Sequence, residues 1–395
     1  MTPDSTNSEG KAARLLELAG LFLRLGATSF GGPASHIAMM EPEVVGKRRW
    51  LTRQQFLDLL GAANLIPGPS STELAISVGY TRAGWMGLCV AGASFILPAA
   101  LITGAFAWAY VRFGALPRAE SVLGAIKAAV IAIIAIAVWR LGKAAVKDAG
   151  LAVLGAAALA AFLIGVNPVV ILFGGGAVGM VARKARFWRS GKSLALWPGL
   201  LGRMNMNMAT AAPLAYARFP PAENPTLVRI ALFFLKVGTV LYGGGYVLLA
   251  FLEQGLVHQH GWLTREQLLD AVAIGQFTPG PVLSTATFIG YLLGGARGAA
   301  VATVAIFLPS FFYVGLLAPV LFRLRQSSWM AAFLDSVNVC AVALMIGVTF
   351  KLATEAFRGP PSWIIAAAAL VILIRWKVNP AWIVFAAGIV GLLLR

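Results

Sequence analysis

The sequence has few charged residues, which make up 12% of its 395 residues. Soluble domains carry about 25% of such residues, so this composition excludes an ordinary soluble globular protein. The chain is instead 59% apolar, with a mean hydropathy of +0.81, and contains long apolar runs such as 84–108 and 122–139. Runs of this length can cross about 30 Å of hydrocarbon as helices. They do not alternate with a period of two, so they do not predict the strands of a membrane β-barrel.

Cysteine and histidine are also scarce. The two cysteines, Cys89 and Cys340, lie in apolar runs, which predicts two buried small side chains and no disulfide. Of the three histidines, His36 stands alone and is more typical of a structural residue than of a ligand. No spacing of His, Cys and carboxylates resembles a metal site, and no nucleophile–base pair is visible. We therefore expect no metal site, no cofactor, no catalytic residues and no enzymatic activity.

Acidic residues are fewer than basic ones, 15 against 32, which gives a net charge of +17. Cytoplasmic loops of membrane proteins collect Lys and Arg, so much of this excess reflects topology. It is also compatible with an anionic substrate. The basic residues are scattered between the apolar runs and form no soluble basic domain, so nucleic acid is not an expected partner.

The second half of the sequence repeats the first with a shift of 212 residues. Over residues 21–69, 18 of 49 positions are identical. The matches include Trp50-Leu51-Thr52-Arg53 with Trp262-Leu263-Thr264-Arg265, and Pro67-Gly68-Pro69 with Pro279-Gly280-Pro281. We therefore predict an N-terminal transporter repeat over 1–182, a basic cytoplasmic linker over 183–232 and a C-terminal transporter repeat over 233–395.

The charges of matching loops predict that the two repeats are inverted. The first loop carries Lys47, Arg48, Arg49 and Arg53. Its counterpart carries His258, His260 and Arg265, with Glu253 and Glu266 nearby. By the positive-inside rule the first loop and the linker are cytoplasmic and the second loop is not. Inverted repeats are common in secondary transporters, whose binding sites lie between the repeats near the midplane.

One repeat reads as a series of apolar segments, two of which are broken. A span over 16–40 is interrupted at Gly31-Gly32-Pro33, and a segment over 54–80 is broken at Pro67-Gly68-Pro69. Further spans are expected over 84–110, 122–142, 150–165 and 168–182. If segment 54–80 is re-entrant, each repeat crosses the membrane five times, which makes ten crossings with both termini outside. The predicted fold is an all-α polytopic membrane protein of two homologous inverted-topology repeats of about five transmembrane helices each, with broken or re-entrant Pro-Gly-Pro helices.

The broken segments are the candidate substrate site. Proline and glycine leave backbone groups unpaired, which lipid penalises by several kcal/mol for each group. The helix that restarts after Pro69 offers free amides and a positive dipole end, which suit an anion. A single break is compatible with a mere kink, but the matching second copy favours a transport site. The candidate substrate-binding residues at the breaks are Gly31, Gly32, Pro67, Gly68, Pro69, Ser70, Ser71, Gly243, Gly244, Pro279, Gly280, Pro281, Ser284 and Thr285.

Cations within the spans add to this candidate site. Arg24 and Lys236 match across the repeat, so one cation from each half could complement a dianion. The alternative is that both are snorkelling residues near helix ends. Lys127, which matches Asn338 with a shift of 211, is a further candidate to line the path.

Acidic residues near the breaks are candidates for carrying a coupling proton. Glu73 follows the first Pro-Gly-Pro directly and has no acidic counterpart in the second repeat. Capping a helix or pairing with a cation are alternative roles for it. The other proton-coupling candidates are Glu41, Asp58, Glu253 and Asp270. For the two aspartates, a place at an interfacial helix start is the alternative.

The Phe30-Gly31-Gly32-Pro33 phrase, the Trp50-Leu51-Thr52 turn, the Pro-Gly-Pro motif and their second copies resemble those of the chromate ion transporter family, of the long two-domain kind. The second glycine motif departs slightly, since it reads Tyr242-Gly243-Gly244-Gly245. The resemblance covers nearly the whole chain. It implies a multi-pass protein of the bacterial inner membrane that exports chromate from the cytoplasm, driven by the proton motive force, and confers chromate resistance.

The implied partners are the lipid bilayer and a small inorganic oxyanion, chromate or the similar sulfate, and a homodimer is left open. Three alternatives to chromate export remain. One is a sulfate or other oxyanion transporter of the same architecture, including an importer. Another is an intramembrane enzyme that uses Glu41, Asp58 and Glu73. The third is a membrane scaffold, which would not need two polar breaks.

Overall fold

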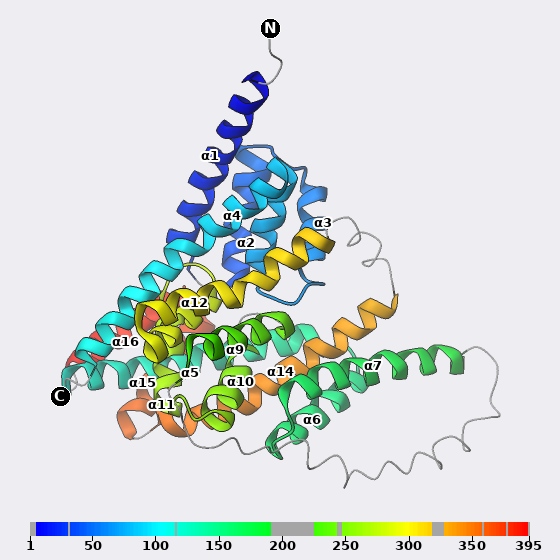
Figure 1. Cartoon of the computed structure of the whole chain (residues 1–395). Helices are drawn as coiled ribbons and strands as arrows, with labels where there is room; N and C mark the ends of the chain where they lie inside the picture. The colour runs from blue at the N-terminus through cyan, green and yellow to red at the C-terminus, as the bar shows by residue number, and fades with distance from the viewer. Residues whose placement is uncertain are drawn as a thin grey trace.

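The computed structural model describes residues 5–30, 32–114, 117–190, 225–242, 247–317, 328–357, 359–376 and 378–393. All regular elements in these ranges are helices (Figure 1). The first repeat comprises α1 (Ser5–Thr28), α2 (Pro33–Glu41), the π-helical turn η1 (Pro42–Lys47), α3 (Arg53–Ala63), α4 (Ser70–Phe113), α5 (Pro117–Ala145), α6 (Ala149–Leu163) and α7 (Pro168–Ser190). The second comprises α9 (Leu227–Val240), α10 (Leu248–Leu252), the π-helical turn η4 (Glu253–Gln259), α11 (Arg265–Phe277), the 3₁₀ turn η5 (Val282–Ser284), α12 (Thr285–Leu317), α14 (Ser328–Ala356), α15 (Pro360–Trp376) and α16 (Pro380–Leu393).

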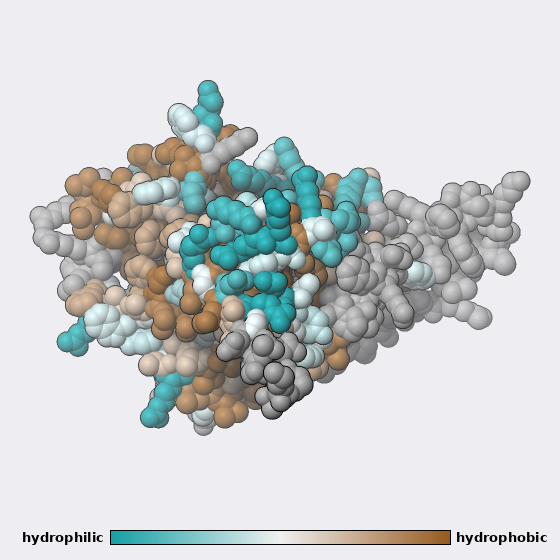
Figure 2. Space-filling model, turned by 90° about the horizontal axis from the view of Figure 1, so that it is seen from above, coloured by the Kyte–Doolittle hydropathy of each residue, from teal (hydrophilic) through white to brown (hydrophobic). Residues whose placement is uncertain are grey.

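The described helices confirm an all-α membrane protein. Four stretches are long and apolar enough to cross a membrane, namely Ser70–Phe113, Glu120–Ala145, Val282–Leu316 and Trp329–Ala356. The apolar helices α6, α15 and α16 are shorter, with 15, 17 and 14 residues. On the face shown in Figure 2, hydrophilic residues gather near the middle and hydrophobic residues lie around much of the margin. The count of ten crossings and the predicted bounds of the linker, most of which lies outside the described residues, stay predictions.

Each Trp-Leu-Thr-Arg turn starts a helix with the same cap. The Thr52 hydroxyl accepts the Gln55 N–H at 3.2 Å, while the Gln55 side chain accepts the Thr52 N–H at 2.9 Å. Thr264 and Gln267 repeat this reciprocal pair at 3.1 and 3.0 Å. Such a capping box satisfies two of the amides that a helix start leaves free. It fixes the start of α3 and α11 at the same place in both repeats.

The segment that carries the first Pro-Gly-Pro is re-entrant, as predicted. α4 is kinked at Ala83 and Gly84, and Gly84 has a φ of +62°. Residues 70–82 therefore fold back against the rest of α4, and a Cβ on Gly79 would overlap the carbonyl oxygen of Gly87. α12 has the same kink at Gly294 and Gly295.

The two ends of this re-entrant segment lie side by side. The guanidinium of Arg82 lies 5.2 Å from the ring centroid of Trp50, and it also pairs with Glu17 at 3.3 Å. Trp50 lies three residues before α3 begins at Arg53, so the half-helix 70–82 ends beside the point where α3 begins. Arg53 and Arg82 thus lie on one side, which is the condition for a re-entrant hairpin.

Corresponding helices of the two repeats pack antiparallel. The Lys147 ammonium near the end of α5 lies 2.7 Å from Asp335 near the start of α14, and Gly142 lies against Val342. α4 and α12 are likewise antiparallel, since Gly315 packs on Trp85 while Thr287 lies nearest Gly104. A two-fold axis that relates two antiparallel helices is perpendicular to them. If the helices cross the membrane, that axis lies in the membrane plane. The repeats are therefore inverted in the membrane, as the loop charges predicted.

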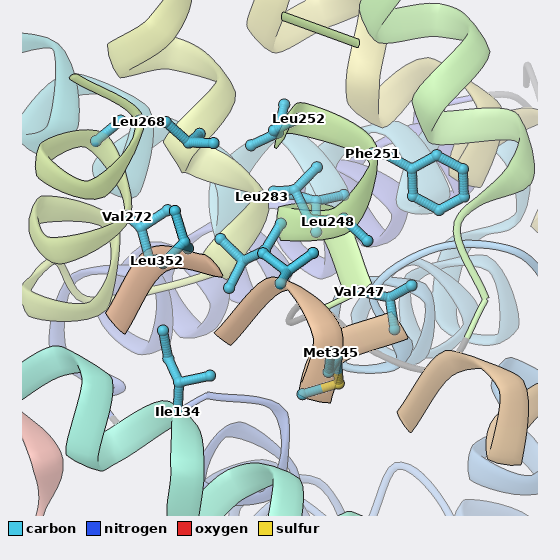
Figure 3. Close-up of a cluster of buried hydrophobic side chains, with 14 of the residues drawn as sticks. Ile134, Val247, Leu248, Phe251, Leu252, Leu268, Val272, Leu283, Met345 and Leu352 are labelled. Atoms are coloured by element: carbon cyan, nitrogen blue, oxygen red, sulfur yellow. The ribbon is translucent and has the colours of Figure 1, made fainter. Parts of the chain in front are cut away.

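The repeats also interlock around a shared core. α15 and α16 of the second repeat pack on α5, and α6 and α7 of the first repeat pack on α14. Figure 3 shows part of the core, where Leu268 and Val272 of α11 lie near Leu352 of α14 and above Ile134 of α5. The antiparallel pair α4 and α12 crosses above this core in Figure 1. The arrangement holds the broken segments of both repeats between long helices.

Candidate functional site

The structure brings each Pro-Gly-Pro break against a residue that precedes the glycine break of the other repeat. The Gly68 N–H donates to the Leu241 carbonyl at 2.7 Å, and the Gly280 N–H donates to the Ser29 carbonyl at 2.8 Å. Ser29 and Leu241 are equivalent positions, and each lies two residues before a Gly-Gly pair. Both Pro-Gly-Pro motifs are buried. The broken backbone is therefore covered by protein and partly paired across the repeats, as membrane depth requires.

The first Pro-Gly-Pro break, at Pro67-Gly68-Pro69 (the first break), is rich in buried polar groups. Glu73 is fully buried, and the Ser310 hydroxyl from the second repeat donates to its Oε1 at 3.5 Å. His36 is also fully buried, and its Nδ1 lies 3.0 Å from the Ser71 hydroxyl. The edge of the Phe95 ring contacts the same imidazole, with the ring centroids 5.5 Å apart. A carboxylate, an imidazole and hydroxyls thus meet at the start of the half-helix 70–82.

Several of these groups have unused hydrogen-bonding capacity. Within the described parts of the chain, seven buried side-chain atoms have no hydrogen-bond partner, and four of them lie here, namely Ser29 Oγ, His36 Nε2, Thr72 Oγ1 and Glu73 Oε2. Buried polar atoms are normally paired, so a cluster of unpaired ones indicates a place for a bound ion or water. Ser29 and His36 lie on either side of the Gly31-Gly32 pair, and Thr72 and Glu73 lie in the first turn of α4, after Pro67-Gly68-Pro69.

At the second Pro-Gly-Pro break, the described buried hydroxyl groups have hydrogen-bond partners. The Thr103 hydroxyl donates to the Ser284 hydroxyl at 3.2 Å, and the Thr285 hydroxyl donates to the Val282 carbonyl at 2.8 Å. The Thr278 hydroxyl donates to the Gly275 carbonyl at 3.1 Å. The two breaks therefore match in their backbone contacts but differ in their side-chain hydrogen bonding. The first break, which has the unpaired buried atoms, is the better candidate to bind an ion.

The two predicted cations lie at exposed positions outside this buried cluster. Arg24 is 52% exposed and pairs with Glu43 at 2.8 Å, and Glu43 also receives Lys47 at 2.8 Å. The hydrogen bond from Lys47, supported by Arg24, lowers the pKa of Glu43 against the opposing effect of its partial burial. Lys236 is exposed as well. Binding of a dianion by this pair stays a prediction.

The predicted acidic residues fall into two groups. Glu41 and Asp58 are partly exposed, and Glu41 lies 3.4 Å from Arg53. Glu253 and Asp270 are buried with cationic partners: Glu253 contacts His258, Arg265 and Lys351, while Asp270 contacts Lys127. Glu73 differs from all of them, since its described neighbours include a hydroxyl donor but no ion-pair partner closer than 4.0 Å.

The remaining site predictions can be placed briefly. Gly32 directly precedes α2 with a φ of +79°, and Ser70 opens α4. Gly31, Gly243 and Gly244 lie outside the described residues. Sequence reasoning gave no site role to His36 or Ser310. Ser310 could have been noticed from the sequence, because it follows Pro309, which matches Pro98 in the first repeat. His36 belongs to no motif that would have pointed to a role in the site.

A cavity of about 440 Å³ lies elsewhere, between α4, α5, α11 and α16. Its walls are apolar, with Phe106, Ile126, Phe277 and Val384 among them, and Tyr110 at one side. An oxyanion would find few donors there. Within the described residues, no group of three or more His, Cys, Asp or Glu side chains could hold a metal ion.

Comparison with known proteins gives a consistent result. The family model described as "Chromate transporter" matches residues 16–180 and 228–392, two stretches offset by the same 212 residues as the internal repeat. The chain is 35% identical over 381 residues to the chromate transport protein of Cupriavidus metallidurans, which covers 96% of this chain and 93% of that protein. It is 32% identical to the probable chromate transport protein of Synechococcus elongatus over 93% of this chain and 91% of that one. It is also 32% identical to the chromate transport protein of Pseudomonas aeruginosa, over 96% and 92% of the two chains. No solved structure matches the chain.

Proposed function

The chain belongs to the chromate transporter family, and from that premise we propose that it is a secondary active transporter that exports chromate from the cytoplasm. The export crosses the bacterial inner membrane, is driven by the proton motive force and confers chromate resistance. The anion binds between the two repeats, at the first Pro-Gly-Pro break. Chromate is proposed as the substrate because relatives are named chromate transport proteins. The binding site is proposed from the physical chemistry of the break.

The observation that carries this proposal is the buried polar cluster at the first break. The half-helix that begins at Ser70 directs its N-terminal amides and positive dipole end toward the break. His36 and Ser71 lie beside it with hydrogen-bonding capacity to spare. Backbone amides, hydroxyls and an imidazole can surround a tetrahedral oxyanion without a metal. The second repeat contributes Ser310 and the Leu241 carbonyl, so the site depends on the contact between the repeats.

Glu73 gives this site a way to couple anion and proton. An ionised carboxylate beside a dianion is strongly repelled, because the two charges interact across a poorly polarisable interior. A proton on Glu73 removes the repulsion and turns the carboxyl group into a donor. Occupancy by the anion is then linked to protonation of Glu73. The other acidic candidates are exposed or already paired with cations.

The membrane potential supplies a driving force with the correct sign. Moving a charge of −2 out of an inside-negative cell releases about 4.6 kcal/mol per 100 mV, and carrying one proton outward costs about 2.3 kcal/mol of that. A net negative charge still leaves, so export remains favourable. The electrical part of the proton motive force therefore drives a dianion outward even when a proton accompanies it.

Sulfate is the second candidate substrate. It is also a tetrahedral dianion and can use the same donors, so a sulfate transporter of this architecture fits the break equally well. A homodimer also stays a prediction.

The test is uptake of labelled chromate into inverted membrane vesicles, with and without an imposed proton motive force and with excess sulfate. Uptake that needs the gradient and is only weakly inhibited by sulfate supports chromate export. Gradient-linked sulfate movement without chromate uptake would replace the first proposal with the second.

A further inference from the structure

A second cluster of charges, built around the buried pair Lys127 and Asp270, lies away from the first break. Asp270 of α11 is 2% exposed, and its Oδ1 lies 3.0 Å from the Lys127 ammonium of α5. The same ammonium lies 3.0 Å from Glu266 Oε1, one helical turn earlier on α11. The Tyr110 hydroxyl, near the end of α4, donates to Asp270 Oδ2 at 2.8 Å. Both carboxylates and the lysine are thus engaged with each other.

This cluster ties one repeat to the other. Lys127 and Tyr110 belong to the first repeat, whereas Glu266 and Asp270 belong to the second. α11 is the helix that leads into the second Pro-Gly-Pro break. It cannot move away from α4 and α5 unless this ion pair opens. A buried ion pair that loses one partner leaves an uncompensated charge, so the contact strongly opposes separation while the surroundings stay dry.

The matching place in the other repeat is built differently. Asp58 corresponds to Asp270, but Gln54 stands for Glu266 and Asn338 stands for Lys127. Asp58 is partly exposed and Asn338 is exposed. Because the repeats are inverted, these two places lie toward opposite membrane faces. One face therefore has a buried charged contact between the repeats, whereas the equivalent residues toward the other face are more exposed and less charged.

We propose that Lys127 and Asp270, assisted by Tyr110 and Glu266, form the gate of the transport path on the face where α11 begins. The positive-inside rule makes this the extracytoplasmic face. The proposal rests on the proposed function, in which the repeats rock about a central site. In the closed state the two carboxylates hold the lysine. When α11 moves, the ammonium is released toward the path, where its charge favours an outgoing anion.

The test measures access to a reporter cysteine behind the gate. Thr103 is buried on α4, about two helical turns deeper than Tyr110. Thr103→Cys is introduced into a background with Cys89→Ala and Cys340→Ala. Right-side-out vesicles are treated with a membrane-impermeant quaternary-ammonium thiosulfonate, and the labelling rate is measured. Inverted vesicles report access from the opposite face.

We expect Lys127→Met and Asp270→Asn each to raise labelling from the extracytoplasmic face at least about tenfold, because each removes one charge of the buried pair that holds α11 to α5. Among the described residues, Lys127→Met leaves Asp270 with Tyr110 alone, and Asp270→Asn leaves Lys127 with Glu266 alone. The double variant removes both charges of the buried pair and leaves the partly exposed Glu266 without Lys127, so it should label at an intermediate rate. Asp58→Asn is the matched control and should leave labelling from this face unchanged. If a single variant fails to accumulate as folded protein, the double variant decides the question.

Labelling at the unaltered rate from both faces in the folded variants would overturn the gate. Chromate flux is measured in the same vesicles without the reporter substitution, because labelling needs no substrate. Absent chromate flux in the protein with Lys127 and Asp270 unaltered, together with faster labelling of the gate variants, would overturn the chromate assignment and leave the gate standing. Normal chromate flux with unchanged labelling would overturn the gate and leave the chromate assignment standing.

Discussion

Replacing Gly68 by alanine should separate the function of the first break from its stability. Gly68 has a φ of +140°, which L-residues rarely adopt. A Cβ at this position would overlap Glu73 Oε1 and lie 2.6 Å from the Ser310 hydroxyl oxygen. Both are ends of flexible side chains, so they can shift away. The substitution therefore moves the carboxyl group of Glu73 and disturbs its contact with the second repeat.

The expected stability cost is about 1–3 kcal/mol, from the backbone conformation alone. Gly84→Ala is the matched control, since Gly84 has a φ of +62° and a Cβ there would meet no atom within 4 Å. It carries a similar backbone cost without touching the site. We expect both variants to lose similar thermal stability in detergent, while Gly68→Ala alone loses most of its oxyanion flux.

The assay is initial chromate uptake into inverted vesicles, normalised to the amount of folded transporter, alongside thermal unfolding of the purified variants. Undiminished flux in Gly68→Ala would refute the reasoning, because the displaced carboxyl group would then have no role. A loss of flux in Gly84→Ala as large as that in Gly68→Ala would refute it as well, because strain alone would then explain both.

Three further predictions follow from the caps and surface charges. Thr52→Ala and Thr264→Ala should each cost about 1 kcal/mol, by loss of a capping box, and thermal unfolding should show costs of similar size in the two repeats. The lowered pKa of Glu43 stabilises the fold above the ordinary value of 4.5, and this contribution is lost as the pH falls through the lower folded value. Glu43→Gln should therefore weaken the acid-induced loss of stability between about pH 5 and pH 3, and an unchanged profile in pH-dependent unfolding would contradict this. Neutralising Arg24 and Lys236 together should abolish anion binding if the two-cation hypothesis holds. Affinity retained in a chromate titration would contradict that hypothesis and assign anion binding to the buried break.

Backbone features of the fold were largely predictable from the sequence. Pro-Gly-Pro lacks backbone amide donors, and the Thr of the Trp-Leu-Thr-Arg turn caps a helix. Both effects are local, so they can be predicted from the sequence. Inversion was predictable because loop charge records topology. The start of α1 at Ser5, well before the predicted span at residue 16, shows an amphipathic extension that a hydropathy argument misses.

Side-chain roles were less predictable, since they depend on which helices meet. Lys127 was noted only as a residue that could line the path, but α11 of the other repeat surrounds it with two carboxylates. His36 gains its importance from contact with Ser71, 35 residues away. Arg24 matched Lys236 in sequence, yet Glu43, which has no acidic counterpart, pairs with Arg24. Such pairings arise from tertiary contacts between segments distant in sequence, which a repeat alignment does not contain.

The central claim is that the oxyanion and the coupling proton meet at Glu73, and simultaneous measurement of chromate and proton movement tests it most directly. Proteoliposomes held at a fixed potassium diffusion potential would compare the unaltered protein with Glu73→Gln, with Asp58→Asn as the control carboxylate. We predict one proton per chromate in the unaltered protein and in Asp58→Asn. In Glu73→Gln we predict chromate movement that is uncoupled from protons and independent of pH. Protons that still move with chromate in Glu73→Gln would contradict the claim.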